Sequence, residues 1–230
     1  MRILATQINY YDSDLYNLIF PYISEERQYR LKKYFFAEDQ IRLLVGELFL
    51  RISAIYYWGI DNKAICFNYN EYGKPQFQNF SDFHFNISYS DQWVVIVLDH
   101  SPVGIDIEQV RPIDLALADY FFTEKEIHQL FMQPIEYRIN YFYKLWTLKE
   151  SYIKAVGKGL SIPLQSFSFD LSFENINFQT NLEDDIEWSF KQYQLHSNYE
   201  MAVSSTHKDF PEKIQIVPLL SLINKIKLIE

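Results

Sequence analysis

Four charged residues in two short segments of this chain have the types and spacing to hold a metal ion beside a phosphate. Asp106 and Glu108 lie two residues apart in an apolar, strand-like run, so their carboxylates share one face. Glu150 and Lys154 lie four residues apart in a helix-like run and share one side of that helix. Like charges on one face raise each other's pKa unless solvent or a cation neutralises them. The pattern therefore indicates three carboxylates and a lysine around a divalent cation.

Each segment also has a purely structural interpretation. Asp106 and Glu108 are typical of the solvated side of an edge strand. Glu150 and Lys154 fit a surface ion pair that contributes about 0.3–0.5 kcal/mol and has no chemical role. Taken together, the two segments favour a metal and phosphate site, because each lies within a long and specific stretch of sequence.

The joint pattern resembles a known enzyme family. Gly104–Glu108, followed by residues 142–160 with the sequence FYKLWTLKESYIKAVGKGL, is similar to the signature of the 4′-phosphopantetheinyl transferases, in particular their surfactin-type, two-domain branch that modifies carrier proteins. Tyr72–Pro75 and Phe85–Ser90 are similar to the coenzyme A-binding loop and strand of that family, and they stand in the same order. The resemblance runs from about residue 24 to about residue 171, and more thinly to residues 201–203.

The resemblance implies a magnesium-dependent transfer of 4′-phosphopantetheine from coenzyme A to a serine of an apo acyl or peptidyl carrier protein. Asp106, Glu108 and Glu150 would hold Mg²⁺, and Lys154 would neutralise charge on the pyrophosphate. Either Glu126 or Glu150 would take the serine proton, directly or through water, and adenosine 3′,5′-bisphosphate would leave. Glu126 fits a structural role equally well, because it stands three residues after a threonine, the spacing of a capping box.

The same resemblance assigns nine residues to the coenzyme A site. They comprise basic side chains for the 3′-phosphate, a loop for the adenine and two strand residues: Arg27, Arg30, Arg42, Tyr72, Gly73, Lys74, Pro75, Ser88 and Tyr89. The basic residues also fit a solvated helix face, and Tyr72 fits a surface turn. Residue 89 departs from the family, which has histidine there. A phenol can donate one hydrogen bond to a phosphate oxygen but carries no positive charge, so we expect weaker binding of coenzyme A.

Two other classes of function stay open at this stage. The tyrosine at residue 89 is compatible with a catalytically weakened module that binds coenzyme A and transfers nothing. The carboxylates are compatible with a magnesium-dependent phosphodiesterase that cleaves a coenzyme A-like pyrophosphate with water. For the transferase, we expect the carrier protein to dock on apolar residues of 112–120 and of the segment after Gly159, although both segments also fit packed loops.

Composition argues against several classes of protein. With 21 basic and 30 acidic residues the net charge is −9, whereas a nucleic-acid-binding protein needs a large basic face. The sequence has no apolar stretch of about 18 residues and its N-terminal apolar run is too short for a signal peptide, so we expect a cytoplasmic protein without a membrane span. The single cysteine, Cys66, allows neither a disulfide nor a cysteine zinc cluster within the chain, and we predict that it lies in the core.

The order of predicted elements is similar in the two halves of the chain. Helices are expected after Ser24, at 38–58, after Thr123 and from Pro134 to Val156, and strands at 65–69, 84–89, 93–98, 103–108, 166–173, 186–195, 200–204 and 213–217. Together with the resemblance, this order predicts an α+β fold of two similar lobes in a pseudo-two-fold arrangement with the active site in the cleft between them. Residues 1–102 would bind coenzyme A, and residues 103–230 would carry the magnesium and phosphoryl-transfer residues. Because both lobes belong to one chain, we expect a monomer.

Overall fold

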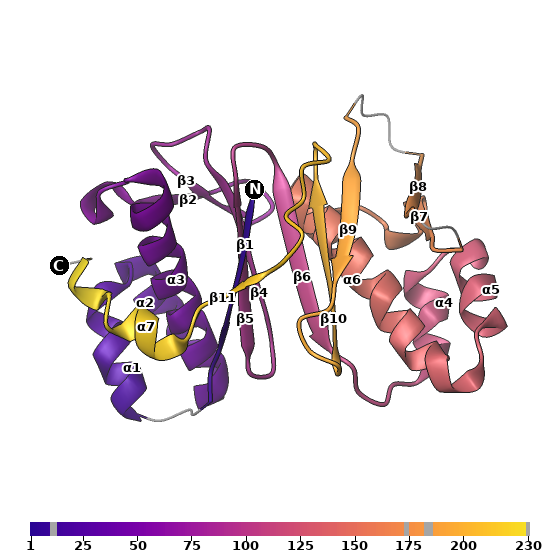
Figure 1. Cartoon of the computed structure of the whole chain (residues 1–230), viewed down its shortest axis with the longest axis horizontal. Helices are drawn as coiled ribbons and strands as arrows, with labels where there is room; N and C mark the ends of the chain where they lie inside the picture. The colour runs from indigo at the N-terminus through magenta and orange to yellow at the C-terminus, as the bar shows by residue number, and fades with distance from the viewer. Residues whose placement is uncertain (10–12, 173–174, 182–185, 229–230) are drawn as a thin grey trace.

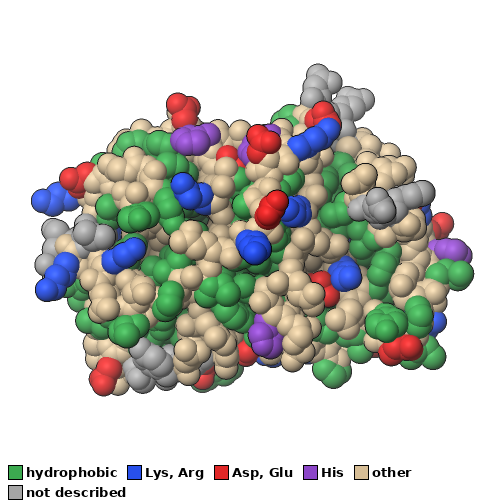
Figure 2. Space-filling model, viewed as in Figure 1, with side chains coloured by type: hydrophobic (Ala, Val, Ile, Leu, Met, Phe, Trp, Pro, Cys, Tyr) green, Lys and Arg blue, Asp and Glu red, His purple; other side chains and the backbone are tan. Residues whose placement is uncertain are grey.

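The protein has four layers, in the order helix, sheet, sheet, helix (Figure 1). The structure is a computed structural model that describes residues 1–9, 13–172, 175–181 and 186–228. This mixture of helices and sheets confirms the predicted α+β class. None of the helices in the described ranges is long and apolar enough to cross a membrane. On the face drawn in Figure 2, acidic and basic side chains are interspersed and no continuous basic surface forms.

The longer helices and strands lie where the sequence patterns predict them, whereas several short elements were not predicted from the sequence. The helices are α1 Ser13–Ile19, α2 Glu25–Leu31, α3 Ala37–Trp58, α4 Ala118–Phe121, α5 Glu124–Met132, α6 Arg138–Val156 and α7 Leu219–Ile223. The strands are β1 Arg2–Gln7, β2 Phe67–Tyr69, β3 Pro75–Phe77, β4 His84–Ser90, β5 Trp93–Asp99, β6 Val103–Gln109, β7 Phe167–Asp170, β8 Asn177–Thr180, β9 Ser189–Tyr193, β10 Tyr199–Ser205 and β11 Gln215–Ile216. The sequence analysis did not predict β1, β3, β8, α1, α4 or α7, and residue 173 of a predicted strand lies outside the described residues.

The first sheet, in the order β11-β1-β5-β4, packs against the long helix α3. Apolar residues at helical spacing on α3, such as Leu44 and Leu48, contact Ile96 and its neighbours on β5 in one core. The helix ends at Gly59, whose φ of 67° is a left-handed conformation that favours glycine. Cys66, expected in this core, is exposed, because the chain leaves a short 3₁₀ turn at this point and only then enters β2.

The second sheet, in the order β6-β10-β9, packs against α6. This helix begins at Arg138 instead of Pro134, because residues 135–137 form a 3₁₀ turn, and it ends at Gly157 as predicted. Gly104 of β6 lies against the helix backbone: a Cβ atom placed there would come within 2.1 Å of the carbonyl oxygen of Ser151. Only glycine permits this approach, which brings β6 and α6 into direct contact.

The two sheets meet through apolar side chains that alternate along their strands. The residues of this central core are Ile3, Ala5, Trp93, Val95, Val97, Val103, Ile105, Ile107, Tyr193, Tyr199, Met201 and Val203. Because side chains of a strand alternate between its faces, Asp106 and Glu108 point away from this core and toward α6. Asp106 is only 2% exposed, so the solvated edge-strand interpretation of this pair is wrong.

The C-terminal segment returns to the first half of the molecule. Strand β11 pairs in parallel with β1, with Leu4 opposite Gln215, and Leu219 and Leu222 of α7 lie in the core beneath α3 (Figure 1, yellow). The predicted division at residue 102 assigned this segment to the second lobe, whereas the structure packs it against the first. The chain therefore crosses between the two sheets a second time after β10.

Candidate active site

Strands β4 and β6 of the two sheets lie side by side and are joined by side chains in place of a backbone ladder. Every second residue of β4 accepts a hydrogen bond from every second backbone amide of β6: Asn86 Oδ1 from Ile105 (2.9 Å), Ser88 Oγ from Ile107 (3.4 Å) and Ser90 Oγ from Gln109 (2.9 Å). These six residues are called the seam below. The seam satisfies the outer edge of β6 and places the polar residues of β4 beside the carboxylates of β6.

Asp106, Ser88 and Lys154 converge at the seam from β6, β4 and α6. The ammonium of Lys154 lies 2.5 Å from Asp106 Oδ1 and 3.1 Å from Ser88 Oγ, and the Ser88 hydroxyl donates to the same Asp106 oxygen at 2.9 Å. Burial works against the charged form of Lys154, yet the nearby carboxylates, led by Asp106, raise its pKa overall. The lysine is thus a fixed cation whose side chain is still 28% exposed.

Glu108 and Glu150 flank this pair, and the pKa of each is raised. Burial is the main cause for Glu108, and the negative charge of Asp106 adds to it, so its pKa rises to about 7, although the Ser90 hydroxyl donates to it at 3.0 Å. Burial also raises the pKa of Glu150, with Lys154 opposing and Asp106 adding to the shift. Three neighbouring carboxylates are therefore held in surroundings that disfavour their negative charge.

The predicted metal ligands lie near one another but do not form a ready-made ion site. Within the residues that the structure describes, no three His, Cys, Asp or Glu side chains are placed to hold an ion together. The donor chemistry nevertheless fits a hard cation, because these are carboxylate oxygens and Asp106 Oδ2 is buried without any hydrogen-bond partner. A cation bound at this oxygen would satisfy it and lower the raised pKa values of its neighbours.

A cavity of about 220 Å³ opens beside this cluster, between α2, α3 and β4. Its lining residues are Arg27, Arg30, Tyr34, Leu43, Gly46, Glu47, Pro75, Asn86, Ile87 and Tyr89. It brings together four of the residues predicted to bind coenzyme A, namely Arg27, Arg30, Pro75 and Tyr89. Burial and the neighbouring Tyr34 raise the pKa of the Tyr89 phenol, while the charges of Arg27 and Lys154 act against this rise. Tyr89 therefore lies between the cavity and the carboxylate cluster.

Five of the residues predicted to bind coenzyme A do not line this cavity. Ser88 belongs to the Asp106 cluster instead. Arg42 bonds Asp39 Oδ1 and the carbonyl oxygen of Asp91, both at 2.6 Å, which holds it at the turn between β4 and β5. Its predicted role as a phosphate contact is not supported by this position.

The loop predicted to hold adenine is organised by Asn70. Its side-chain oxygen accepts from the amides of Tyr72 (3.0 Å) and Lys74 (2.8 Å), and Gly73 between them has a φ of 86°. The Lys74 ammonium points away from the cavity and bonds the carbonyl oxygens of Ala155 (2.9 Å) and Val103 (3.3 Å). Burial lowers its pKa to about 8. The prediction that Lys74 lies near phosphate is wrong in this structure, because the lysine binds one carbonyl at the C-terminal end of α6 and one at the start of β6.

Glu126 is fully buried and has a structural position. The capping box predicted with Thr123 is present, and the second carboxylate oxygen accepts from the amide of Phe169 at 2.9 Å. Lys149, which is also fully buried, forms an ion pair with Glu126 at 2.9 Å. Both oxygens are thus occupied by protein donors, so the expectation that Glu126 acts as a base is corrected. The sequence analysis missed Lys149, which has no sequence signal except its place on α6.

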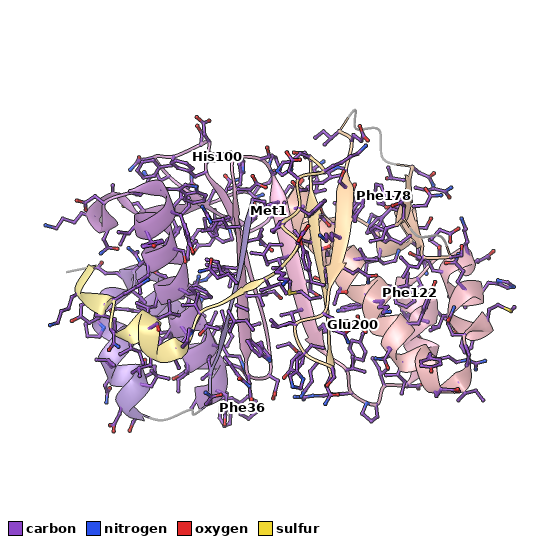
Figure 3. All side chains as sticks on the ribbon, in the orientation of Figure 1. Met1, Phe36, His100, Phe122, Phe178 and Glu200 are labelled. Carbon is purple, nitrogen blue, oxygen red and sulfur yellow. The ribbon has the colours of Figure 1, made fainter. Side chains whose placement is uncertain are left out.

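One buried carboxylate on β10 was not among the predicted site residues. Glu200 on β10, labelled in Figure 3, is 8% exposed and lies opposite Glu108 in the register of β10 and β6. Burial raises its pKa, although Lys144 opposes the rise.

In the segments expected to dock a carrier protein, Tyr120 is 74% and Leu160 is 75% exposed, so both present apolar surface to solvent.

Comparison with known proteins identifies the family. The profile described as the 4′-phosphopantetheinyl transferase superfamily matches residues 102–204, and that described as 4′-phosphopantetheinyl transferase, N-terminal, matches residues 12–101. The chain is 39% identical to the 4′-phosphopantetheinyl transferase Sfp of Bacillus subtilis over 85% of this chain and 88% of that protein. It is 44% identical to the 4′-phosphopantetheinyl transferase gsp of Aneurinibacillus migulanus over 70% of this chain and 68% of that protein. Identity at this level over most of both chains, on a fold that places the predicted acidic residues and lysine together, shows that the chain belongs to the 4′-phosphopantetheinyl transferase family.

Proposed function

We propose that the protein transfers the 4′-phosphopantetheine group of coenzyme A to a serine of an apo carrier protein. The observation that carries this proposal is the convergence of Asp106, Ser88 and Lys154 at the seam, directly beside a cavity with two arginines. An anionic nucleotide in the cavity and a pyrophosphate at the lysine would both find the positive charge that they require. The family relationship supports the same reaction.

In this arrangement Arg27 and Arg30 would bind the 3′-phosphate of coenzyme A, and Lys154 would bind its pyrophosphate. Tyr89, which lies near both Arg27 and Lys154, would donate its hydroxyl to a phosphate oxygen between them. Pro75 would form the wall against which the adenine packs. The anionic part of coenzyme A would thus contact Arg27 and Arg30 at its 3′-phosphate end and Lys154 at its pyrophosphate end.

The carboxylates would hold Mg²⁺ through Asp106, Glu108 and Glu150. When bound, Mg²⁺ would supply positive charge to the pyrophosphate and keep these three carboxylates ionised. Lys154 would stabilise the negative charge that develops on the pyrophosphate as its phosphorus–oxygen bond breaks. Asp106 in turn would keep the lysine protonated and fixed.

The reaction would proceed by direct attack of the carrier serine on the pantetheine-side phosphorus. The serine oxygen forms a bond to that phosphorus, the bond to the bridging oxygen breaks, and adenosine 3′,5′-bisphosphate leaves. Glu150 would take the serine proton, because Glu126 has both oxygens occupied.

The test is to incubate the protein with coenzyme A, Mg²⁺ and an apo carrier protein and to measure the mass of the carrier. We expect the carrier to gain the mass of one phosphopantetheine group, and a carrier with alanine at the modified serine to gain nothing. The Asp106→Asn enzyme is the matched control, because it lacks the carboxylate proposed to hold both Mg²⁺ and Lys154. Release of phosphopantetheine without a carrier would instead indicate the phosphodiesterase, and binding of coenzyme A without any product would indicate a weakened binding module.

The roles of the lobes belong to the same proposal. The cavity lies on the elements of residues 1–102, and Asp106, Glu108, Glu150 and Lys154 come from residues 103–230. Because one chain supplies both, a cytoplasmic monomer would suffice, and sedimentation of the purified protein at two concentrations would test the monomer.

A further inference from the structure

A buried carboxylate in the wall of the arginine cavity has no place in the proposed reaction. Glu47 on α3 is 1% exposed and lines the cavity together with Arg27 and Arg30. A negative charge at this position would weaken the binding of a phosphate if it acted only through Coulomb forces. Its presence in a cavity for an anion therefore calls for another explanation.

The hydrogen bonds of Glu47 provide that explanation. One oxygen accepts from the Ser24 amide (2.7 Å) and from Arg51 Nε (2.8 Å), and the other accepts from the Ser24 hydroxyl (3.1 Å) and from Arg27 Nε (3.2 Å). A carboxylate has about four acceptor positions, and here four donors occupy them. The side chain is thus saturated, and its charge is balanced by two guanidinium groups.

Arg27 is held by Glu47 along one edge only. Within the described residues, the Arg27 guanidinium has a hydrogen-bond partner at Nε alone, and that partner is Glu47. The Arg27 side chain is 16% exposed at the cavity wall. A guanidinium fork that is anchored through Nε retains its two terminal nitrogens for a ligand. Arg30 is held more loosely, with its guanidinium over the Tyr69 ring and Glu26 at 4.0 Å.

We propose that Glu47 is a positioning residue, which fixes the Nε edge of Arg27 so that the terminal nitrogens of the guanidinium meet the 3′-phosphate of coenzyme A. This proposal rests on the proposed function, since it concerns how the same cavity selects its ligand. A lysine at residue 27 would supply charge but could not bond Glu47 and a phosphate along two separate edges. Preorganised donors lose less conformational freedom on binding, which increases affinity for the phosphate.

The sign of the effect of Glu47→Gln separates positioning from simple charge. Glutamine keeps the shape but removes the charge and half of the acceptor capacity, so Arg27 loses a fixed partner. Positioning predicts that the affinity ratio between coenzyme A and 3′-dephospho-coenzyme A falls about tenfold, the usual size for a lost hydrogen bond to a charged group. Coulomb forces alone predict that the ratio rises, because a negative charge leaves the cavity wall.

A double-mutant cycle with Arg27→Met tests whether Glu47 acts through Arg27. We expect Glu47→Gln to change the ratio in the parental protein and to leave it unchanged when Arg27 is already methionine. Calorimetric titration with each of the two ligands, below the unfolding temperature of every variant, gives the ratio. The proposal is overturned if Glu47→Gln leaves the affinity ratio unchanged or raises it. It is also overturned if Glu47→Gln lowers the ratio as much in the Arg27→Met background as in the parental protein.

Arg51→Lys is the control for a purely structural role of Glu47. Arg51 shares the carboxylate and also bonds Asn62 Oδ1 at 2.8 Å, but it does not line the cavity. We expect this variant to melt at a lower temperature but to keep the parental affinity ratio between the two ligands. If its affinity ratio fell as much as that of Glu47→Gln, Glu47 would have a role in stability alone. If Glu47→Gln does not fold, Glu47→Asp, which is too short to reach all four donors, takes its place. If the parental protein binds coenzyme A and 3′-dephospho-coenzyme A equally well, the proposed use of the cavity is contradicted. If the parental protein prefers coenzyme A and the Glu47 variants keep that preference, only the positioning role of Glu47 is contradicted.

Discussion

Helix α6 carries two lysine–carboxylate pairs that differ in what surrounds them. Lys149 donates to Glu126, to the carbonyl oxygen of Leu164 at 2.7 Å and to that of Phe167 at 2.8 Å, and both partners of the pair are fully buried. This pair is called the closed pair below. Lys154 and Asp106 form the open pair, in which the lysine is 28% exposed and one oxygen of Asp106 has no hydrogen-bond partner.

The difference teaches that burial of charge does not by itself mark an active site. The closed pair uses every donor of its ammonium on protein acceptors, so it can bind nothing more and serves the packing of α5, α6 and β7. The open pair has an unsatisfied buried oxygen, two further carboxylates with raised pKa values and a cavity beside it. The buried Asp106 oxygen without a hydrogen-bond partner, with flanking carboxylates of raised pKa, is the feature that distinguishes the open pair.

The largest expected effect is on stability, at the closed pair. Lys149→Met leaves Glu126 buried without its cation, so we expect the free energy of unfolding to fall by about 3–5 kcal/mol. Urea denaturation measures the fall, and the double variant Lys149→Met, Glu126→Leu should recover much of it. The rate of transfer per folded molecule should stay near the parental rate. A stable Lys149→Met protein that had lost transfer would show that the closed pair belongs to the active site.

The next effect is on the reaction, at the open pair. Lys154→Met should lower the single-turnover rate of transfer about 100-fold or more, because a fixed cation at the reacting phosphate is lost. The loss of stability should be smaller than for Lys149→Met, since Asp106 can take up a proton or a cation. Lys154→Arg should restore part of the rate, because its charge is kept but its shape is broader. A Lys154→Met protein that melts several degrees lower yet transfers at the parental rate would make the open pair structural as well.

A smaller effect should appear in the pH dependence of stability. The pKa of Glu108 is raised from 4.5 to about 7, so its protonated form stabilises the fold below pH 4.5, and this contribution is lost as the pH rises through 7. Without metal, Glu108→Gln should therefore gain stability relative to the parental protein as the pH rises from 4.5 to 8. Melting curves in a chelator check this gain, and added Mg²⁺ should reduce it. Parallel pH profiles of the two proteins would contradict the raised pKa.

The smallest effect is expected at Tyr89, which connects the open pair with the cavity. Tyr89→Phe should weaken coenzyme A binding by about tenfold, the usual size for one lost hydrogen bond to a charged group. Tyr89→His should tighten binding most clearly below about pH 6.5, where imidazole is protonated. Titration calorimetry at two pH values measures both. Unchanged affinity in both variants would show that residue 89 does not contact the ligand.

The sequence predicted the parts of the site that depend on local periodicity. The alternation of β6 placed Asp106 and Glu108 on one face, and the four-residue spacing of α6 placed Glu150 and Lys154 on one side. The capping box at Thr123 also follows from spacing alone, and it is present. Each of these features is determined by residues within a few positions of one another, which is the range over which sequence patterns are informative.

The contacts that sequence did not predict join residues far apart in the chain. Lys74 follows a glycine turn, and the family resemblance implied a place near phosphate for it, but its ammonium bonds Ala155, 81 residues away. Glu47 lies in an apolar helix run and Lys149 begins a short polar run, Lys149–Ser151, and neither position indicates its partners. Strand β11 has only two residues and is defined by its pairing with β1. Such contacts depend on how the elements pack together, which periodicity does not contain.

The return of the C-terminal segment to the first sheet has a consequence for folding during synthesis. Strand β1 leaves the ribosome well before its partner β11, since Leu4 pairs with Gln215 and most of the described fold lies between them in the sequence. The outer edge of β1 therefore stays unpaired while the whole second half of the protein is translated, a period in which exposed strand edges favour association with other chains. The first sheet reaches its final form only after β11 has been translated, so a strand made late completes a sheet whose other strands were made much earlier.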